Sequence, residues 1–148
     1  MSVCEIRTGV PADLRDLARI FRHASLSNNG DRDVLLANPA LPVKNVAELL
    51  ALAKAKPGTL NFGSTSQGGS PHMSGELLKT MAQIDIQHVP YKGGGPMMID
   101  LIGGQIQLGF DNLPSAIAHV RSGKVRALAV TTAKRWPGAP EIPTLAEA

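Results

Sequence analysis

Three segments rich in glycine and hydroxyl groups have the chemistry to bind a small anion. They are residues 63–72, 91–96 and 111–115. Each follows a short apolar stretch and precedes a run of apolar residues at helical spacing. A helix that begins in such a segment presents free backbone N–H groups and the positive end of its dipole. Glycine lets a ligand approach the backbone, and serine and threonine hydroxyls add donors, so a small carboxylate is the favoured guest.

Eleven residues of these segments are predicted to contact the solute. They are Gly63, Ser64, Thr65, Ser66, Gly68, Gly69, Ser70, His72, Tyr91, Gly93 and Asp111. The segment at 63–72 is the strongest candidate because it is the longest and the richest in hydroxyl groups. Each of the other two, taken alone, is better explained as a plain turn. Asp111 ends a predicted strand, where it could accept a hydrogen bond from a solute amino or hydroxyl group, orient loop amides, or cap a helix.

Helix termini alone are too weak to give tight binding. One exposed terminus stabilises an anion by about 0.3–1 kcal/mol, so three give about 1–3 kcal/mol. A micromolar ligand needs about 8 kcal/mol. Direct hydrogen bonds, burial and a second wall of a cleft must supply the rest, so we expect this chain to form half of a site.

Patterns typical of enzymes are missing from the sequence. Ser66 lacks the first glycine of a G-x-S-x-G nucleophile elbow. The P-loop pattern G-x-x-x-x-G-K-S/T does not occur either, so a nucleotide-binding P-loop is excluded. The four histidines and Cys4 show no metal-ligand spacing. His72 is interpreted as a polar residue at a helix start rather than as a catalytic group, His88 as a structural residue or one that supports a site residue, and Lys92 as a solvated lysine or an anion partner. We therefore predict a binding protein rather than an enzyme, with no cofactor and no metal.

The composition fits one globular unit of 148 residues. Hydrophobic residues make up 43% of the chain and aromatic residues 3%, so the core must be mainly aliphatic. The net charge is +3, but the basic residues are scattered, which excludes nucleic acid as a partner. Cys4 is the single cysteine, so no intrachain disulfide is possible. No apolar run reaches about 18 residues and no signal-peptide pattern opens the chain, so we expect neither a transmembrane helix nor an export signal.

From residue 45 onward, helices and short strands are predicted to alternate. Asn45 followed by Glu48 is a helix-capping pattern, and Pro71, Pro96 and Pro114 stand where later helices begin. The strands are expected at residues 59–63, 84–90, 105–110 and 125–131. The third of these alternates apolar and polar residues, as a half-buried strand does. This order predicts an α/β fold with a mostly parallel sheet, whose carboxyl edge gathers the three binding segments.

The two ends of the chain are less regular. A strand at residues 4–9, a helix at 11–24 and a polar linker at 25–33 are predicted before the alternating region. Residues 143–148 have the pattern of a helix that is just beginning. We place a boundary in the sequence between residues 37 and 38.

Several segments resemble the Bug/TctC family of solute-binding proteins in order and spacing. They are residues 42–49 (PVKNVAEL), 60–64 (LNFGS), 75–77 (GEL), 88–93 (HVPYKG), 104–106 (GQI), 110–112 (FDN) and 143–147 (PTLAE). The resemblance implies a two-lobed Venus-flytrap fold like that of type II periplasmic binding proteins, with one lobe and part of the hinge present here. In that family the loop at 63–72 and the strand end at Asp111 face the ligand.

The resemblance also implies a role and partners. It implies the receptor of a tripartite tricarboxylate transport system, which binds di- or tricarboxylates or acidic amino acids and passes them to membrane transporter subunits. Such a receptor is periplasmic, whereas a chain without a signal peptide would stay in the cytoplasm as expressed. We expect the protein to be a monomer.

Residues 1–37 depart from the family's pattern. Residues 6–7, 11–14 and 25–32 resemble the opening of GNAT N-acetyltransferases, but the resemblance stops before any acetyl-CoA-binding loop and implies no acetyl transfer. We expect a GNAT-like segment at 1–37 and a partial solute-binding domain at 38–148, joined as a fused or rearranged fragment. A truncated product with no independent function is one alternative, and an acetyltransferase-like enzyme is another.

Overall fold

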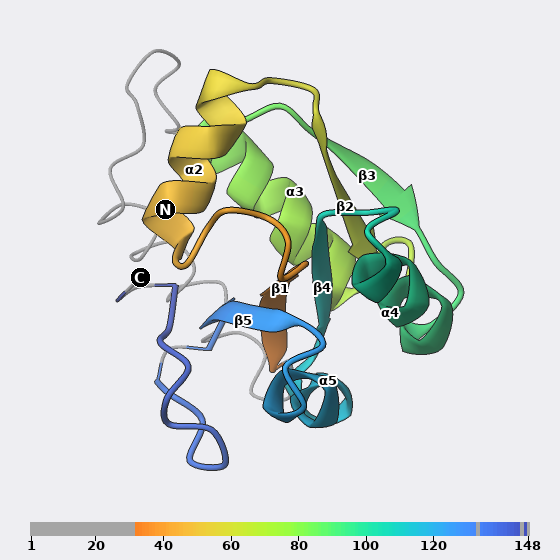
Figure 1. The fold of residues 1–148 in the computed structure, drawn as a ribbon, viewed down its shortest axis with the longest axis vertical. Coiled ribbons are helices and arrows are strands. Elements are labelled where there is room, and N and C mark those ends of the chain that lie inside the picture. Colours follow the sequence, from red (N-terminus) through yellow and green to blue (C-terminus); the bar gives the residue numbers. More distant parts are fainter. Residues whose placement is uncertain (1–31, 133, 146, 148) are drawn as a thin grey trace, which may run out of the picture.

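The computed structural model describes residues 32–132, 134–145 and 147, which form an α/β unit (Figure 1). The strands are β1 Asp33–Ala37, β2 Leu60–Ser64, β3 Ile86–Pro90, β4 Leu108–Asn112 and β5 Arg126–Val130. The helices are α2 Val46–Ala55, α3 Ser70–Ala82, α4 Gly94–Gly103 and α5 Leu113–Arg121. The strand predicted at 4–9 and the helix predicted at 11–24 lie outside the described residues.

The described strands form one sheet in the order β3-β2-β4-β1-β5. β2 pairs in parallel with β3 and β4, whereas β1 runs antiparallel to both β4 and β5. Four of the five strands therefore point the same way, and the prediction of a mostly parallel α/β sheet is confirmed. Their carboxyl ends share one edge, where α3, α4 and α5 begin.

β1 is absent from the predicted elements, and the linker predicted up to Asp33 is wrong at that residue because β1 begins there. All five residues of β1 are buried. A strand covered on both faces has no alternation of apolar and polar residues, so the pattern that marks a half-buried strand does not appear in it.

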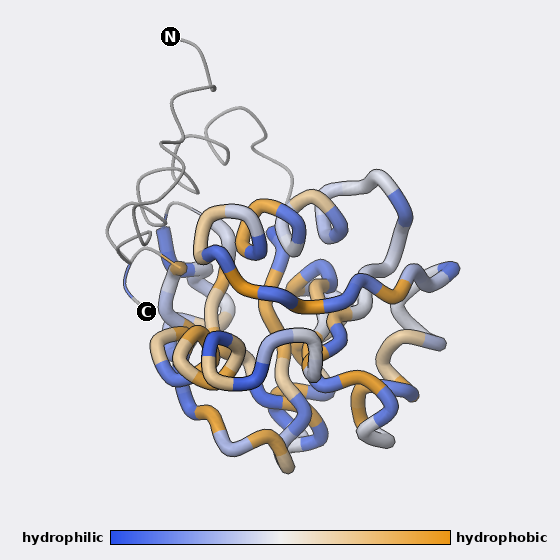
Figure 2. Tube along the Cα trace, turned by 90° about the horizontal axis from the view of Figure 1, so that it is seen from above, coloured by the Kyte–Doolittle hydropathy of each residue, from blue (hydrophilic) through white to orange (hydrophobic). Residues whose placement is uncertain are grey.

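Helices cover both faces of the sheet and enclose two cores (Figure 1). β1 shows the division, since Leu35 packs with α2 and α3 while Val34 and Leu36 pack with α4 and α5. Along the helical coils in Figure 2, hydrophobic and hydrophilic residues alternate, as expected for helices with one buried face. The sheet is thus the middle layer of three.

β4 corrects the prediction of a half-buried strand at 105–110. It starts at Leu108, and its residues up to Asp111 are buried. Phe110 packs in the core under α2 and α3. On the other face, a Cβ added to Gly109 would lie 3.2 Å from Leu101 and 3.3 Å from Met97. The small residue thus makes room for α4 instead of facing water.

The structure confirms the helix start predicted at Asn45 but not the one predicted at residues 143–148. Asn45 Oδ1 accepts a hydrogen bond from the Glu48 N–H at 2.8 Å, which confirms the predicted cap of α2. The helix start predicted at 143–148 does not continue into a helix among the described residues. Thr144 instead forms a parallel bridge with Val130, and Glu147 Oε2 accepts from the Thr144 N–H at 2.9 Å.

Candidate functional site

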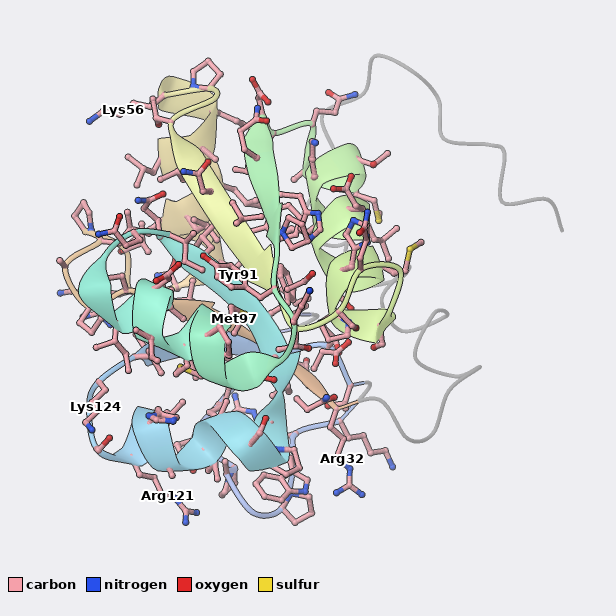
Figure 3. The ribbon with its side chains drawn as sticks, turned by 90° about the vertical axis from the view of Figure 1, so that its right-hand side faces the viewer. Arg32, Lys56, Tyr91, Met97, Arg121 and Lys124 are labelled. Carbon is pink, nitrogen blue, oxygen red and sulfur yellow. The ribbon has the colours of Figure 1, made fainter. Side chains whose placement is uncertain are left out.

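A cavity of about 460 Å³ lies at the carboxyl edge of the sheet, where α4 and α5 begin. Its lining residues come from the ends of β2 and β4 and from the two helices. They are Thr65, Gly93, Gly94, Gly95, Met98, Asp111, Asn112, Ser115 and His119. Figure 3 shows α4 and α5 side by side, with Arg121 at the carboxyl end of α5 and Lys124 just beyond it. Two helix N-termini therefore face one hollow.

Three of the eleven predicted site residues line this cavity: Thr65, Gly93 and Asp111. The others lie outside its lining: Gly63, Ser64, Ser66, Gly68, Gly69, Ser70, His72 and Tyr91. Of the residues that the prediction missed, Gly94, Gly95, Asn112 and Ser115 belong to the segments singled out in the sequence. Met98 and His119 lie inside helices, and no local pattern distinguishes them from ordinary helical residues.

Gly63 has a packing role in the structure. A Cβ added to it would lie 2.6 Å from Ile106 Cδ1 and 2.8 Å from Met97 Cγ. It pairs across the ladder with Gly109, so two glycines stand side by side beneath α4. Figure 3 places Met97 and Tyr91 at this junction of α4 with the sheet. Gly63 thus lets α4 approach the strands closely, which positions the helix terminus at the cavity.

Tyr91 supports α4 from the same side. Its hydroxyl donates a hydrogen bond to Asp100 Oδ2 at 2.7 Å. Burial, together with this acidic neighbour, raises the pKa of Tyr91 to about 12. The hydroxyl is therefore neutral at physiological pH and occupied within the lobe.

The hydroxyl-rich loop at 64–70 is held by hydrogen bonds with neighbouring histidines of α3 and β3. Ser64 is fully buried, with its Oγ 2.8 Å from His88 Nε2. The Gly68 N–H donates to His72 Nδ1 at 2.9 Å. These groups are used inside the protein, which explains why Thr65 is the residue of this loop that reaches the cavity.

Asp33 occupies the start of α3. The Ser70 hydroxyl donates to Asp33 Oδ2, and the Ser74 hydroxyl donates to the same oxygen at 3.1 Å. Asp33 is almost fully buried in β1. The anion at this helix terminus is thus a carboxylate of the protein itself, and no sequence pattern connected residue 33 with residue 70.

Asp111 is the acidic group of the cavity. Only 4% of it is exposed, and its Oδ1 accepts the Asn112 N–H at 2.7 Å. A Cβ added to Gly94 would lie 3.1 Å from Asp111 Oδ2, so the carboxyl group stands against the first residue of α4. Burial raises the pKa of Asp111, although the Asn112 N–H, Ser115 and His119 oppose the rise.

A carboxylate solute in contact with an ionised Asp111 would meet strong repulsion. Two unit charges 4 Å apart interact by about 4 kcal/mol at an effective dielectric constant of 20. Two helix termini together return only about 0.6–2 kcal/mol. The charge state of Asp111 therefore decides how an anion can sit in this cavity.

Three potential metal ligands also come together, outside the cavity. Nitrogen or carboxylate atoms of His72, Glu76 and His88 lie within 4.8 Å of one another. However, the two imidazoles are stacked, with centroids 3.9 Å apart and an interplanar angle of 11°. A metal ion lies in the plane of each imidazole that binds it, and parallel stacked rings do not share such a point. The arrangement favours a structural clamp between α3 and β3.

Acidification should destabilise the fold through His88. Burial, and after it the neighbouring His72, lower the pKa of His88 below 6.5, while Glu76 opposes them. The unfolded chain then binds this proton more readily, so stability is full above about pH 6.5 and falls as the pH drops toward the folded pKa. Urea midpoints should decrease between about pH 8 and pH 5, and His88→Gln should reduce that decrease. The same decrease in both proteins would contradict this role.

The fold and the cavity define a class of protein. A mixed sheet with helices on both faces, and a hollow at the carboxyl edge lined by helix N-termini, is one lobe of a periplasmic-binding-protein-like fold. The chain belongs to the TctC family, the tripartite tricarboxylate transporter family receptor, which it matches over residues 10–148. This match includes residues 10–37, most of the segment whose sequence resembles the opening of GNAT N-acetyltransferases.

Relatives and solved structures agree with this membership. The chain is 38% identical to protein BugT of Bordetella pertussis over 114 residues, which are 77% of this chain and 35% of BugT. It matches an R. palustris protein solved with adipate at 44% identity and a TM-score of 0.77, covering 80% of this chain and 40% of that one. MatC from Rhodopseudomonas palustris, solved with bound malate, matches at 30% identity and a TM-score of 0.75 over the same shares. The chain thus spans about a third of the length of its curated relatives.

Family membership bears on activity and location. Two further solved structures that match this chain are a periplasmic transporter, at 40% identity and a TM-score of 0.75, and the periplasmic binding protein BugD, at 32% identity and a TM-score of 0.71. The family and these two neighbours are solute-binding proteins and not enzymes. None of the helices in the described part of the chain has the length and apolar character needed to span a lipid bilayer.

Proposed function

We propose that this chain supplies one lobe of a receptor for a small carboxylate, such as a di- or tricarboxylate or an acidic amino acid. The observation that carries the proposal is the cavity at the N-termini of α4 and α5, with its glycines and the hydroxyl of Thr65. Backbone N–H groups at a helix start bind carboxylates without a cationic side chain. Relatives solved with adipate and malate support the same solute class.

The proposed contacts are few and come from three junctions. Thr65, Gly93 and Asp111 retain the role predicted from the sequence, and Gly94, Gly95 and Ser115 join them. Two helix termini and several direct hydrogen bonds give weak binding, so dissociation constants in the millimolar to micromolar range are expected. A second lobe would close over the cavity and supply the remaining affinity.

The proposal extends to partners and location. The receptor would be a periplasmic monomer that passes its solute to the membrane subunits of a tripartite tricarboxylate transporter, and residues 38–148 would be its solute-binding part. The family match supports this assignment.

Calorimetric titration with adipate, malate, citrate and glutamate up to millimolar concentrations tests the proposal. At least one should bind, and Gly95→Val should weaken it at least tenfold. Gly95 lines the cavity and a Cβ added to it meets no atom within 4 Å, so valine adds bulk at the cavity wall without disturbing the fold. Gly103→Val is the matched control, since its Cβ also meets nothing and it lies at the other end of α4.

Two outcomes would overturn the proposed function. One is that none of the four solutes binds to the wild-type chain. The other is that Gly95→Val and Gly103→Val bind as well as each other and as well as the wild type. Circular dichroism of both variants verifies that each is folded.

A further inference from the structure

The charge of the cavity lining is unusual for a site that takes an anion. Among the residues that the structure describes, Asp111 is the only acidic residue of the lining and His119 is its only other titratable side chain. No lysine or arginine from the described part of the chain lines the hollow. A solute carboxylate that enters therefore meets a buried carboxyl group, and the described lining residues offer no lysine or arginine to offset it.

Asp111 already uses the features that favour an anion. Its Oδ1 accepts the Asn112 N–H at the start of α5, and Oδ2 stands against Gly94 at the start of α4. The positive ends of both helices thus act first on the protein's own carboxyl group. A second carboxylate in the same hollow gains little from the helices while Asp111 is ionised.

The described lining residues around Asp111 include no lysine or arginine that would offset the repulsion between its carboxylate and that of a solute, so a bound proton is the simplest way to remove it. β1 places Val34 opposite Asp111 in the ladder, α4 presents Gly94, and α5 contributes Ser115 and His119. The acidic residue of α4, Asp100, is engaged by the Tyr91 hydroxyl. Burial already favours the protonated form of Asp111. A single proton bound between Asp111 and the solute would turn repulsion into a hydrogen bond.

We propose that a dicarboxylate enters this cavity together with one proton from the solvent, shared between Asp111 and the nearest solute carboxyl group. The inference rests on the proposed function of the same cavity and deepens it. Asp111 is then the residue that sets specificity, because it accepts solutes that present a hydrogen-bond donor or can take up a proton. It disfavours anions that can do neither.

Adipate is a suitable probe because its two carboxyl groups are its only polar groups. Calorimetry at pH 7 in phosphate and in Tris, whose ionisation enthalpies differ, counts the protons taken up per adipate bound. The wild type should take up about one proton per adipate bound. Its affinity for adipate should fall about tenfold for each unit by which the pH rises, because the proton is then harder to bind. Asp111→Asn should take up none and lose the pH dependence. Uptake of no proton by the wild type, or equal uptake by Asp111→Asn, would overturn the inference.

Two variants separate Asp111 from other sources of protons. Asp85→Asn makes the same change of charge at an exposed residue beside the amino end of β3, and it should still take up one proton. His119→Gln should also take up one, and loss of the uptake in this variant would assign the proton to His119 instead. If Asp111→Asn does not fold, the carboxyl ¹³C signal of Asp111 in the wild type decides. It should move toward the protonated form on addition of adipate, and an unmoved signal contradicts the inference.

The outcomes distinguish this inference from the proposed function. Adipate binding without proton uptake leaves a carboxylate receptor and removes the shared proton. If none of the four solutes used above binds to the wild type, both fail.

Discussion

Replacing Phe62 with alanine should lower the free energy of unfolding by about 3–5 kcal/mol, as is typical of a large buried aromatic residue. Phe62 is fully buried in β2. Its ring lies 4.9 Å from that of His88 and 6.1 Å, edge-on, from that of Phe110. A Cβ added to Gly75 would lie 2.2 Å from Phe62 Cε2, so the ring packs directly against α3 at the space that this glycine leaves. Its loss leaves a cavity between α3 and the sheet.

Urea denaturation followed by circular dichroism measures this effect. Phe62→Leu is the matched control, because it keeps most of the apolar volume and should cost about 1 kcal/mol. Domains of this size are stable by only about 5–15 kcal/mol, so the alanine variant could be largely unfolded at physiological temperature. A loss below about 1 kcal/mol for Phe62→Ala would contradict the central position of this ring.

Replacing Asp33 with alanine should destabilise the fold by about 2–4 kcal/mol. Its carboxylate accepts hydrogen bonds from the Ser70 and Ser74 hydroxyls, and bonds to a charged group contribute about 1.5–3 kcal/mol each. The change removes the acceptor of both hydroxyls and the negative charge at the start of α3. The loop that leads from β2 into α3 loses its anchor to β1.

Chemical denaturation of a short series tests this. Asp33→Asn keeps one oxygen that can accept a hydrogen bond, so it should lose less stability than Asp33→Ala. Asp85→Ala removes an exposed carboxylate and should change stability by less than about 0.5 kcal/mol. Equal stability of Asp33→Ala and Asp85→Ala would show that the contact with α3 contributes nothing.

The alternating helices and strands were predictable because each carries a local signal. The Asn45 cap, the prolines at helix starts and the glycines at helix ends act within a few residues of one another. β1 gave no such signal, since its five buried residues lack alternation. The packing of α4 against Gly109 could not be predicted either, because a glycine in a strand carries no information about which helix covers it.

The site was predictable as a place and less so as a set of residues. The carboxyl edge of the sheet follows from the order of the elements, and Thr65, Gly93 and Asp111 are at the cavity there. The sequence does not reveal which partners the hydroxyl groups of the loop at 64–70 bind. Ser70 reaches Asp33, which is far away in the chain, and Ser64 meets His88. Contacts over such separations arise from tertiary packing alone.

The place of β1 in the sheet has a consequence for how the chain acquires its fold. β1 is the first described strand, yet its neighbours β4 and β5 are the last two. During synthesis from the N-terminus, β1 leaves the ribosome long before β4 and β5 have been made, so it has no strand to pair with during that time. Pairings over such long loops close slowly because the chain loses much entropy before contacts form. β1 is therefore the last strand to pair, and refolding should end with its insertion between β4 and β5.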